Sequence, residues 1–228
     1  MLQTGKTFRC SSPFRKPEMN NIRYTLLSDG SSDRALIPIL TWLLHFRLGN
    51  QAINAEYADL RRLPRPPKIL SDRIVKAVEL FPCDILFVHR DAENQPAALR
   101  RREIEDAIST ALTLIQLPHT FCVIPIRMGE AWLLIDETAI RKASGNPISR
   151  APLILPSISR LESLPDPKNT LYGLIQKASG LRGRRLRNLR VNKCVHRLAE
   201  LIDDFTPLRQ LSAFSSLEFD LERQIAAN

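Results

Sequence analysis

The chain has 228 residues, of which 44% are hydrophobic, and a formal net charge of +9. This length fits one α/β domain with an appendage, and no apolar run approaches the roughly 20 residues that a membrane-spanning helix needs. The first twenty residues lack an apolar signal-peptide core, so we expect a cytoplasmic protein without a membrane segment. The four cysteines form no close pair, which argues against a zinc knuckle, and the positive charge favours nucleic acid as a partner.

The first part of the chain predicts two strands and two helices. Residues 1–20 carry Gly, Ser, Pro and basic residues without periodicity, so we expect a flexible tail. A strand is predicted over 22–28 and a helix over 33–48, followed by a weaker strand over 52–60. Ser71 is predicted to cap a second helix, which ends before Pro82.

The alternation of strands and helices continues as far as residue 146. Strands are predicted over 84–88 and 120–126, and helices over 97–114 and 130–144. Four strand–helix units predict an α/β fold in which a Rossmann-like, four-stranded parallel sheet is flanked by helices over 21–146. From 147 to 228 the prolines and basic helical patterns predict a linker and a helical C-terminal extension packed on that domain.

Acidic residues follow three of the predicted strands. Asp29, Asp91 and Glu130 stand at these strand ends, and Asp33 and Glu93 add two further carboxylates nearby. Because parallel strands end at one edge of a sheet, we expect the three strand ends to meet and to hold Mg²⁺ or Mn²⁺. The alternative for any single acid is structural, since an Asp after a strand is often a cap and the start of a helix favours an acid such as Glu130.

Several segments together resemble a known family. Residues 25–33 (TLLSDGSSD) and 87–93 (FVHRDAE) resemble the first two motifs of the Toprim (topoisomerase–primase) domain. Residues 125–136 (PIRMGEAWLLID) resemble a bacterial Toprim-like family of unassigned function, which is related to nucleases of the overcoming-lysogenisation-defect type. Residues 166–171 (DPKNTL) and 213–217 (AFSSL) resemble C-terminal segments of that family.

The resemblance implies a role for each acid. Asp29 stands where Toprim enzymes carry a Glu proposed as general acid/base, and His89 stands where the first Asp of their Asp-x-Asp motif would be. Asp91 keeps the second Asp, so Asp91, Glu93 and Glu130, with Asp33, would hold the metal. Histidine suits Mn²⁺ better than Mg²⁺. The site therefore either uses the remaining carboxylates or has lost its metal activity.

Basic residues outside the acidic cluster are candidates for binding nucleic acid. The first set is a run of five arginines without an acid, and it comprises Arg182, Arg184, Arg185, Arg187 and Arg190. The second set, Arg61 and Arg62, lies in a proline-rich loop. A solvated helix face is the alternative for the first set, although a run of arginines also makes a plausible phosphate track. Arg90 and Arg127, beside the acids, would either pair with them or bind a phosphate.

Two functional hypotheses follow from these features. The first is a divalent-metal-dependent nuclease acting on DNA or RNA, which by resemblance would work beside an ATPase in phage or mobile-element defence. The second is a catalytically inactive Toprim-like module that binds nucleic acid or regulates an ATPase-containing complex. Convergence of Asp29, Asp91 and Glu130 within reach of one metal ion would favour the first hypothesis.

Overall fold

A computed structural model describes residues 21–49 and 51–226, so the predicted tail lies outside the described residues. Four parallel strands form one sheet in the order β2-β1-β3-β4. Their bounds are Asn21–Leu27 for β1, Ala52–Tyr57 for β2, Ile85–His89 for β3 and His119–Val123 for β4. The α/β fold with a four-stranded parallel sheet, predicted from the alternating pattern, is confirmed.

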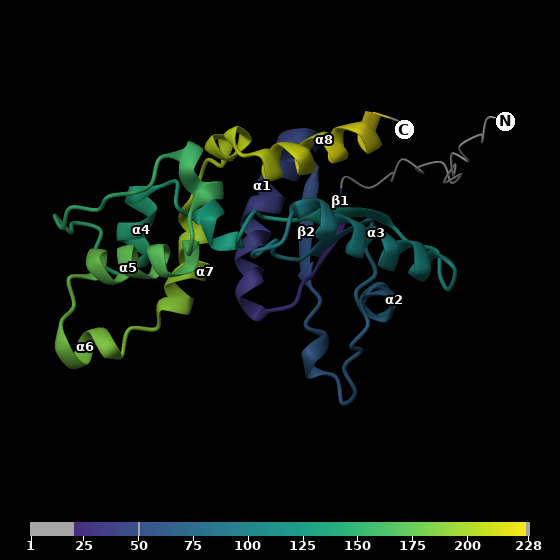
Figure 1. Cartoon of the computed structure of the whole chain (residues 1–228), viewed down its shortest axis with the longest axis horizontal. Helices are drawn as coiled ribbons and strands as arrows, with labels where there is room; N and C mark the ends of the chain where they lie inside the picture. Colours follow the sequence, from purple (N-terminus) through teal and green to yellow (C-terminus); the bar gives the residue numbers. More distant parts are fainter. Residues whose placement is uncertain (1–20, 50, 227–228) are drawn as a thin grey trace.

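Three helices cover the two faces of the sheet. α1 (Ile37–Leu48) packs on one face, together with helices of the C-terminal part. α2 (Leu70–Leu80) and α3 (Ala97–Leu112) pack on the other face (Figure 1). β3 is buried along its whole length, as expected for a central strand of a sheet covered on both faces.

The C-terminal part consists of five helices and two short 3₁₀ helices. The bounds are Glu137–Ala143 for α4, Pro167–Ser179 for α5, Gly183–Arg187 for α6, Val191–Leu201 for α7, Ser212–Ala226 for α8, Ile158–Ser163 for η4 and Thr206–Gln210 for η5. Buried residues of α4, α5, α7 and α8 share one hydrophobic core with β1, β3 and α1, whereas α6 has no buried residue. The contact between the Trp132 and Phe214 rings, whose centroids are 5.4 Å apart, belongs to this shared core.

Some predicted boundaries were wrong for local reasons. The helix predicted over 33–48 is a 3₁₀ helix, η1 (Ser31–Leu36), followed by α1, in whose first turn Pro38 has no N–H to donate. The strand predicted over 52–60 ends at Tyr57, and η2 (Leu60–Arg62) follows. Ser71 does not cap α2, since Ile69 occupies the N-cap position and Ser71 is buried in the first turn.

The helix predicted over 130–144 is in fact two elements. η3 (Gly129–Leu133) ends before α4 begins, because the Asp136 carboxylate accepts a hydrogen bond from the Ala139 N–H at 2.9 Å and so caps α4. The break leaves Glu130 on a short 3₁₀ helix above β4. Within the described residues, no helix combines the length and the apolar character needed to cross a membrane.

Candidate functional site

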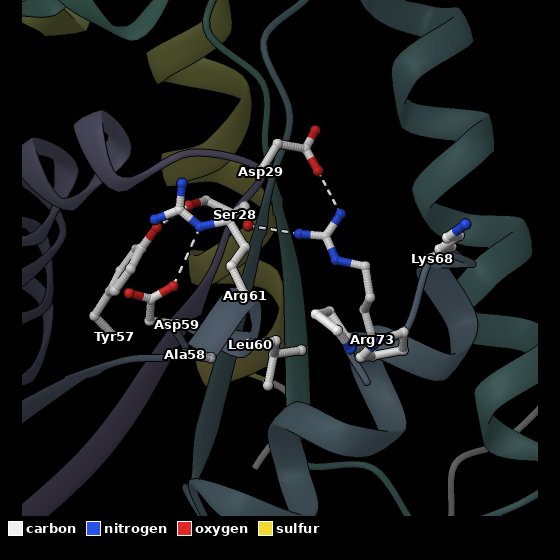
Figure 2. Close-up of a pocket in the computed structure, with 11 residues that line it drawn as sticks. Ser28, Asp29, Tyr57, Ala58, Asp59, Leu60, Arg61, Lys68 and Arg73 are labelled. Atoms are coloured by element: carbon white, nitrogen blue, oxygen red, sulfur yellow. Dashed lines mark hydrogen bonds and ion pairs between the residues drawn. The ribbon is translucent and has the colours of Figure 1, made fainter. Parts of the chain in front are cut away.

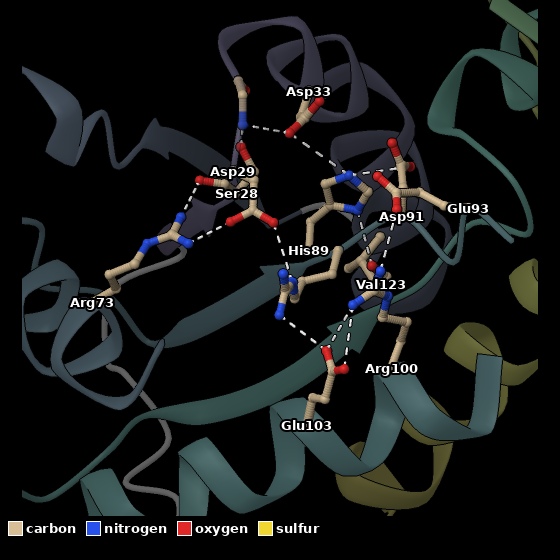
Figure 3. Close-up of polar contacts among 12 residues, drawn as sticks. Ser28, Asp29, Asp33, Arg73, His89, Asp91, Glu93, Arg100, Glu103 and Val123 are labelled. Atoms are coloured by element: carbon tan, nitrogen blue, oxygen red, sulfur yellow. Dashed lines mark hydrogen bonds and ion pairs between the residues drawn. The ribbon is translucent and has the colours of Figure 1, made fainter. Parts of the chain in front are cut away.

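The strand order places a crevice between the ends of β1 and β3. In the sheet, β2 lies on one side of β1 and β3 lies on the other side. The carboxyl ends of β1 and β3 therefore flank a topological switch point. Ligand sites of open α/β sheets lie at such points. A pocket of about 250 Å³ lies there (Figure 3). It is lined by Asp29, Gly30, Asp33, His89, Arg90, Asp91, Glu93 and Arg100.

His89, the last residue of β3, lies at the centre of this crevice. Its side chain is 2% exposed, and its Nδ1 lies 2.9 Å from the carbonyl oxygen of Val123. Because a carbonyl oxygen only accepts hydrogen bonds, Nδ1 carries the hydrogen. Nε2 then faces two carboxylates, with Asp91 Oδ1 at 3.5 Å and Asp33 Oδ2 at 3.8 Å. In its neutral form, a histidine oriented in this way by a backbone carbonyl presents an Nε2 lone pair that suits a metal ion.

Backbone N–H groups hold the two carboxylates in place. The N–H of Gly30 donates to Asp33 Oδ2, and that of Gly129 donates to Asp91 Oδ1, both at 2.9 Å. Asp33 therefore fixes the turn after β1, while Asp91 ties the end of β3 to the start of η3. Neither carboxylate has an arginine or lysine partner within the described residues.

Burial and nearby negative charge change the acidity of Asp91. Burial and repulsion from Asp33 and Glu130 raise the pKa of Asp91 to about 6. The attraction of His89 and the hydrogen bond from Gly129 lower this pKa, but by less. The shift indicates that this crevice places carboxylates together with too little positive charge around them. A bound cation would relieve that repulsion.

Glu130 adjoins this cluster and is paired with a lysine from the C-terminal part. It lines a narrow neighbouring pocket together with Asp33 and His89. Its Oε1 lies 3.5 Å from Nζ of Lys168, in the first turn of α5. Burial by itself lowers the pKa of Lys168, but the nearby Glu130 and Tyr172 raise it overall, so the ammonium keeps its charge. Sequence reasoning did not select Lys168, although it belongs to the segment 166–171 on which the family resemblance partly rests.

Asp29 lines the same pocket as Asp91 but has different partners. Its carboxylate accepts hydrogen bonds from Arg73, on α2, and from Nε of Arg90 at 3.2 Å (Figure 3). Burial raises the pKa of Asp29, yet the two arginines outweigh it and hold this pKa below its usual value. Such an acid stays ionised at neutral pH, which favours a role in orienting arginines over one in proton transfer. Arg73 is a second residue that sequence reasoning did not select.

The remaining candidates near the acids pair with residues that the sequence did not single out. Glu93 Oε2 lies 3.3 Å from Nη2 of Arg100, and the Glu93 side chain is 62% exposed. Arg90 also reaches Glu103 at 3.0 Å. Arg127 donates to the side chain of Asn94. The structure thus places Glu93 against α3, whereas Asp33, His89 and Asp91 face one another.

The metal-binding capacity of the site rests on its donor set. Among residues 21–49 and 51–226, no three His, Cys, Asp or Glu side chains already have the arrangement of a complete metal site. Ligands about 2.1 Å from one ion stand about 3.0 to 3.4 Å apart, and the Nε2–carboxylate distances of 3.5 and 3.8 Å are slightly longer. Asp33, His89 and Asp91 are therefore spaced too widely to form a metal site as they stand. An imidazole in such a donor set would favour Mn²⁺ over Mg²⁺.

The basic candidates fall into two different environments. The five arginines between 182 and 190 are exposed, and none makes a salt bridge within the part of the chain that the structure describes. The leucines between them are partly buried, as predicted for a helix whose arginines face outward. Arg61 and Arg62 instead share Asp59, at 3.2 and 3.0 Å. The η2 turn and α6 lie toward the same lower side of Figure 1.

Comparison with known proteins found no matching family model, no matching curated protein and no matching solved structure. The Toprim resemblance therefore stays a prediction from the sequence motifs.

Proposed function

We propose that this chain is a divalent-metal-dependent nuclease of Toprim type that hydrolyses phosphodiester bonds in DNA or RNA. The observation that carries the proposal is the orientation of His89. Its Nδ1–H donates a hydrogen bond to the carbonyl oxygen of Val123, so Nε2 points toward the carboxylates of Asp33 and Asp91. The raised pKa of Asp91 supports a cation-binding role, because burial and the nearby carboxylates of Asp33 and Glu130 make the ionised form of Asp91 costly without a cation.

Each residue of the site has a role in this proposal. Asp33, His89 and Asp91 would hold Mn²⁺ or Mg²⁺, with Glu130 beside them. When bound, the ion would supply Lewis acidity and an activated water. The Lys168 ammonium, paired with Glu130 at 3.5 Å, would bind a nonbridging oxygen of the phosphate. Asp29 would keep Arg73 and Arg90 oriented at the pocket wall.

A cleavage assay tests this function directly. The purified chain is incubated with labelled DNA and RNA, with Mg²⁺ and Mn²⁺ in separate reactions, beside Asp91→Ala and Glu130→Ala. We expect metal-dependent cleavage by the wild type that both variants lose. Asp106→Ala is the matched control, since Asp106 is an exposed acid on α3 outside the pocket. Equal cleavage by all four proteins would point to a contaminating nuclease and refute the proposal.

The exposed arginines of α6 and its flanks would hold the nucleic-acid backbone in this proposal. Replacing both Arg184 and Arg185 by Gln removes two charges that have no carboxylate partner in the described residues. Binding should weaken similarly for all base sequences, and the slope of log K against log salt should fall by about 1 to 2. Fluorescence anisotropy at several salt concentrations measures both. An unchanged slope would show that these arginines do not contact phosphates.

One observation favours the alternative of an inactive, nucleic-acid-binding or regulatory module. A protonated His89 would itself be a cation between Asp33 and Asp91 and would occupy the role of the metal. Titration of His89 by NMR with and without Mn²⁺ separates the two readings. A histidine that remains protonated at pH 8 and is unaffected by Mn²⁺ would favour the module, which by the family resemblance would serve an ATPase partner.

A further inference from the structure

A second pocket adjoins the one that contains His89. It has a volume of about 200 Å³, lies at the carboxyl ends of β1 and β2, and shares only Asp29 with the first pocket (Figure 2). Its wall comes from the ends of the two strands, from η2 and from the loop before α2. Pockets for drug-sized ligands measure roughly 300–1,000 Å³, so this one suits a smaller group.

Cationic side chains dominate the pocket. Arg61, Arg73 and Lys68 line it from three different segments, and Figure 2 shows Arg73 between the other two. The hydroxyl groups of Ser28 and Tyr57 also line the pocket, with 2.9 Å between their oxygens, and both donate to the carbonyl oxygen of Gly30. The cationic side chains are therefore the groups that face an anion.

The two acids of this pocket are already neutralised. Asp29 is shared by Arg73 and Arg90, and Asp59 is shared by Arg61 and Arg62. Lys68 makes no ion pair with any carboxylate of the described residues. Arg61, Lys68 and Arg73 line the pocket against the two carboxylates of Asp29 and Asp59, which leaves an excess of positive charge for an anion.

We infer that this pocket binds a backbone phosphate of the nucleic-acid strand, adjacent to the phosphate at the His89 site. The inference rests on the proposed function and assigns a substrate subsite to it. The two pockets share Asp29, and neighbouring strands of a sheet are about 4.8 Å apart, so a nucleic-acid strand that crosses this sheet edge would place one phosphate in each pocket. Lys68 would contribute its unpaired charge, and Arg61 and Arg73 would present N–H donors suited to phosphate oxygens.

Binding measured without cleavage tests the subsite. The full chain is titrated into a labelled single-stranded oligonucleotide in EDTA, with inorganic phosphate as a separate ligand in calorimetry. Lys68→Ala and Arg61→Ala are compared with Arg102→Ala and Arg65→Ala. All four substitutions remove one exposed charge, but Arg102 and Arg65 do not line the pocket.

We expect Lys68→Ala and Arg61→Ala to weaken oligonucleotide binding about tenfold and the two control substitutions less than about twofold. If all four substitutions weaken oligonucleotide binding equally, the effect comes from the overall charge of the protein, and the proposed subsite is wrong. Loss of inorganic phosphate binding with unchanged oligonucleotide binding would assign the pocket to free phosphate and also overturn it.

This binding experiment does not test the proposed nuclease function, so the two proposals can be rejected separately. If the wild type binds as expected but does not cleave with any metal, the subsite stands and the nuclease function fails. If the wild type cleaves and all four variants bind alike, the function stands and the subsite fails.

Discussion

Asp91→Asn is expected to stabilise the metal-free protein at pH 7.5 while it lowers metal-dependent cleavage at least about 100-fold. The folded-state pKa of Asp91, about 6, lies above the ordinary value of 3.8. The folded protein therefore binds the proton more tightly, and stability from this group falls as pH rises from about 4 through 6. Two pKa units correspond to about 3 kcal/mol, which is an upper limit for the gain, because asparagine is uncharged and can still accept the Gly129 hydrogen bond.

Urea denaturation in EDTA at two pH values measures this gain. Between pH 7.5 and pH 4.5 the advantage of Asp91→Asn should shrink by about 2 kcal/mol, because wild-type Asp91 becomes protonated in the folded state. Addition of Mn²⁺ should raise the stability of the wild type but not of the variant. Asp106→Asn, on an exposed part of α3, should change stability by less than about 0.5 kcal/mol. If the variant is less stable than the wild type at pH 7.5, attraction to a charged His89 stabilises the Asp91 carboxylate by more than burial destabilises it. That result would contradict the prediction.

Lys168→Met is expected to lower the rate of cleavage about 100-fold or more while metal binding is retained. The substitution keeps the length of the side chain but removes the ammonium beside Glu130. Charged groups that stabilise a developing oxyanion contribute factors of about 10²–10³ in rate. Single-turnover cleavage and Mn²⁺ binding by calorimetry separate the two effects.

The matched control for Lys168 lies on the same helix. Lys177→Met removes an exposed ammonium from α5 at a position away from Glu130 and should leave cleavage unchanged. Lys168→Arg should restore part of the rate, because it restores the charge. The Lys168–Glu130 pair is partly exposed, so its loss should cost less than about 1 kcal/mol of stability. A parallel loss of Mn²⁺ binding would mean that Lys168 organises the metal ligands and does not act on the phosphate.

The sequence by itself predicted the sheet and the end of the sheet at which the acids gather. Runs such as 85–88 are apolar throughout because β3 is covered on both faces, and the helical periodicity between strands indicates parallel crossovers. These patterns depend on neighbouring residues, so they can be read along the chain. The sequence accordingly predicted Asp29, Asp91 and Glu130 at one edge of the sheet, with Asp33 and His89 beside them.

Only the tertiary structure decided how the side chains at that edge divide between two environments. Asp29 and Asp91 follow adjacent strands, yet Asp29 is paired with Arg73 from α2, whereas Asp91 faces His89. Lys168 approaches Glu130 from a helix almost forty positions further along the chain. The hydrogen bond from His89 to Val123 likewise depends on the β3–β4 register. Ion pairs and hydrogen bonds depend on distances of a few ångströms between separate elements, and no local periodicity encodes those distances.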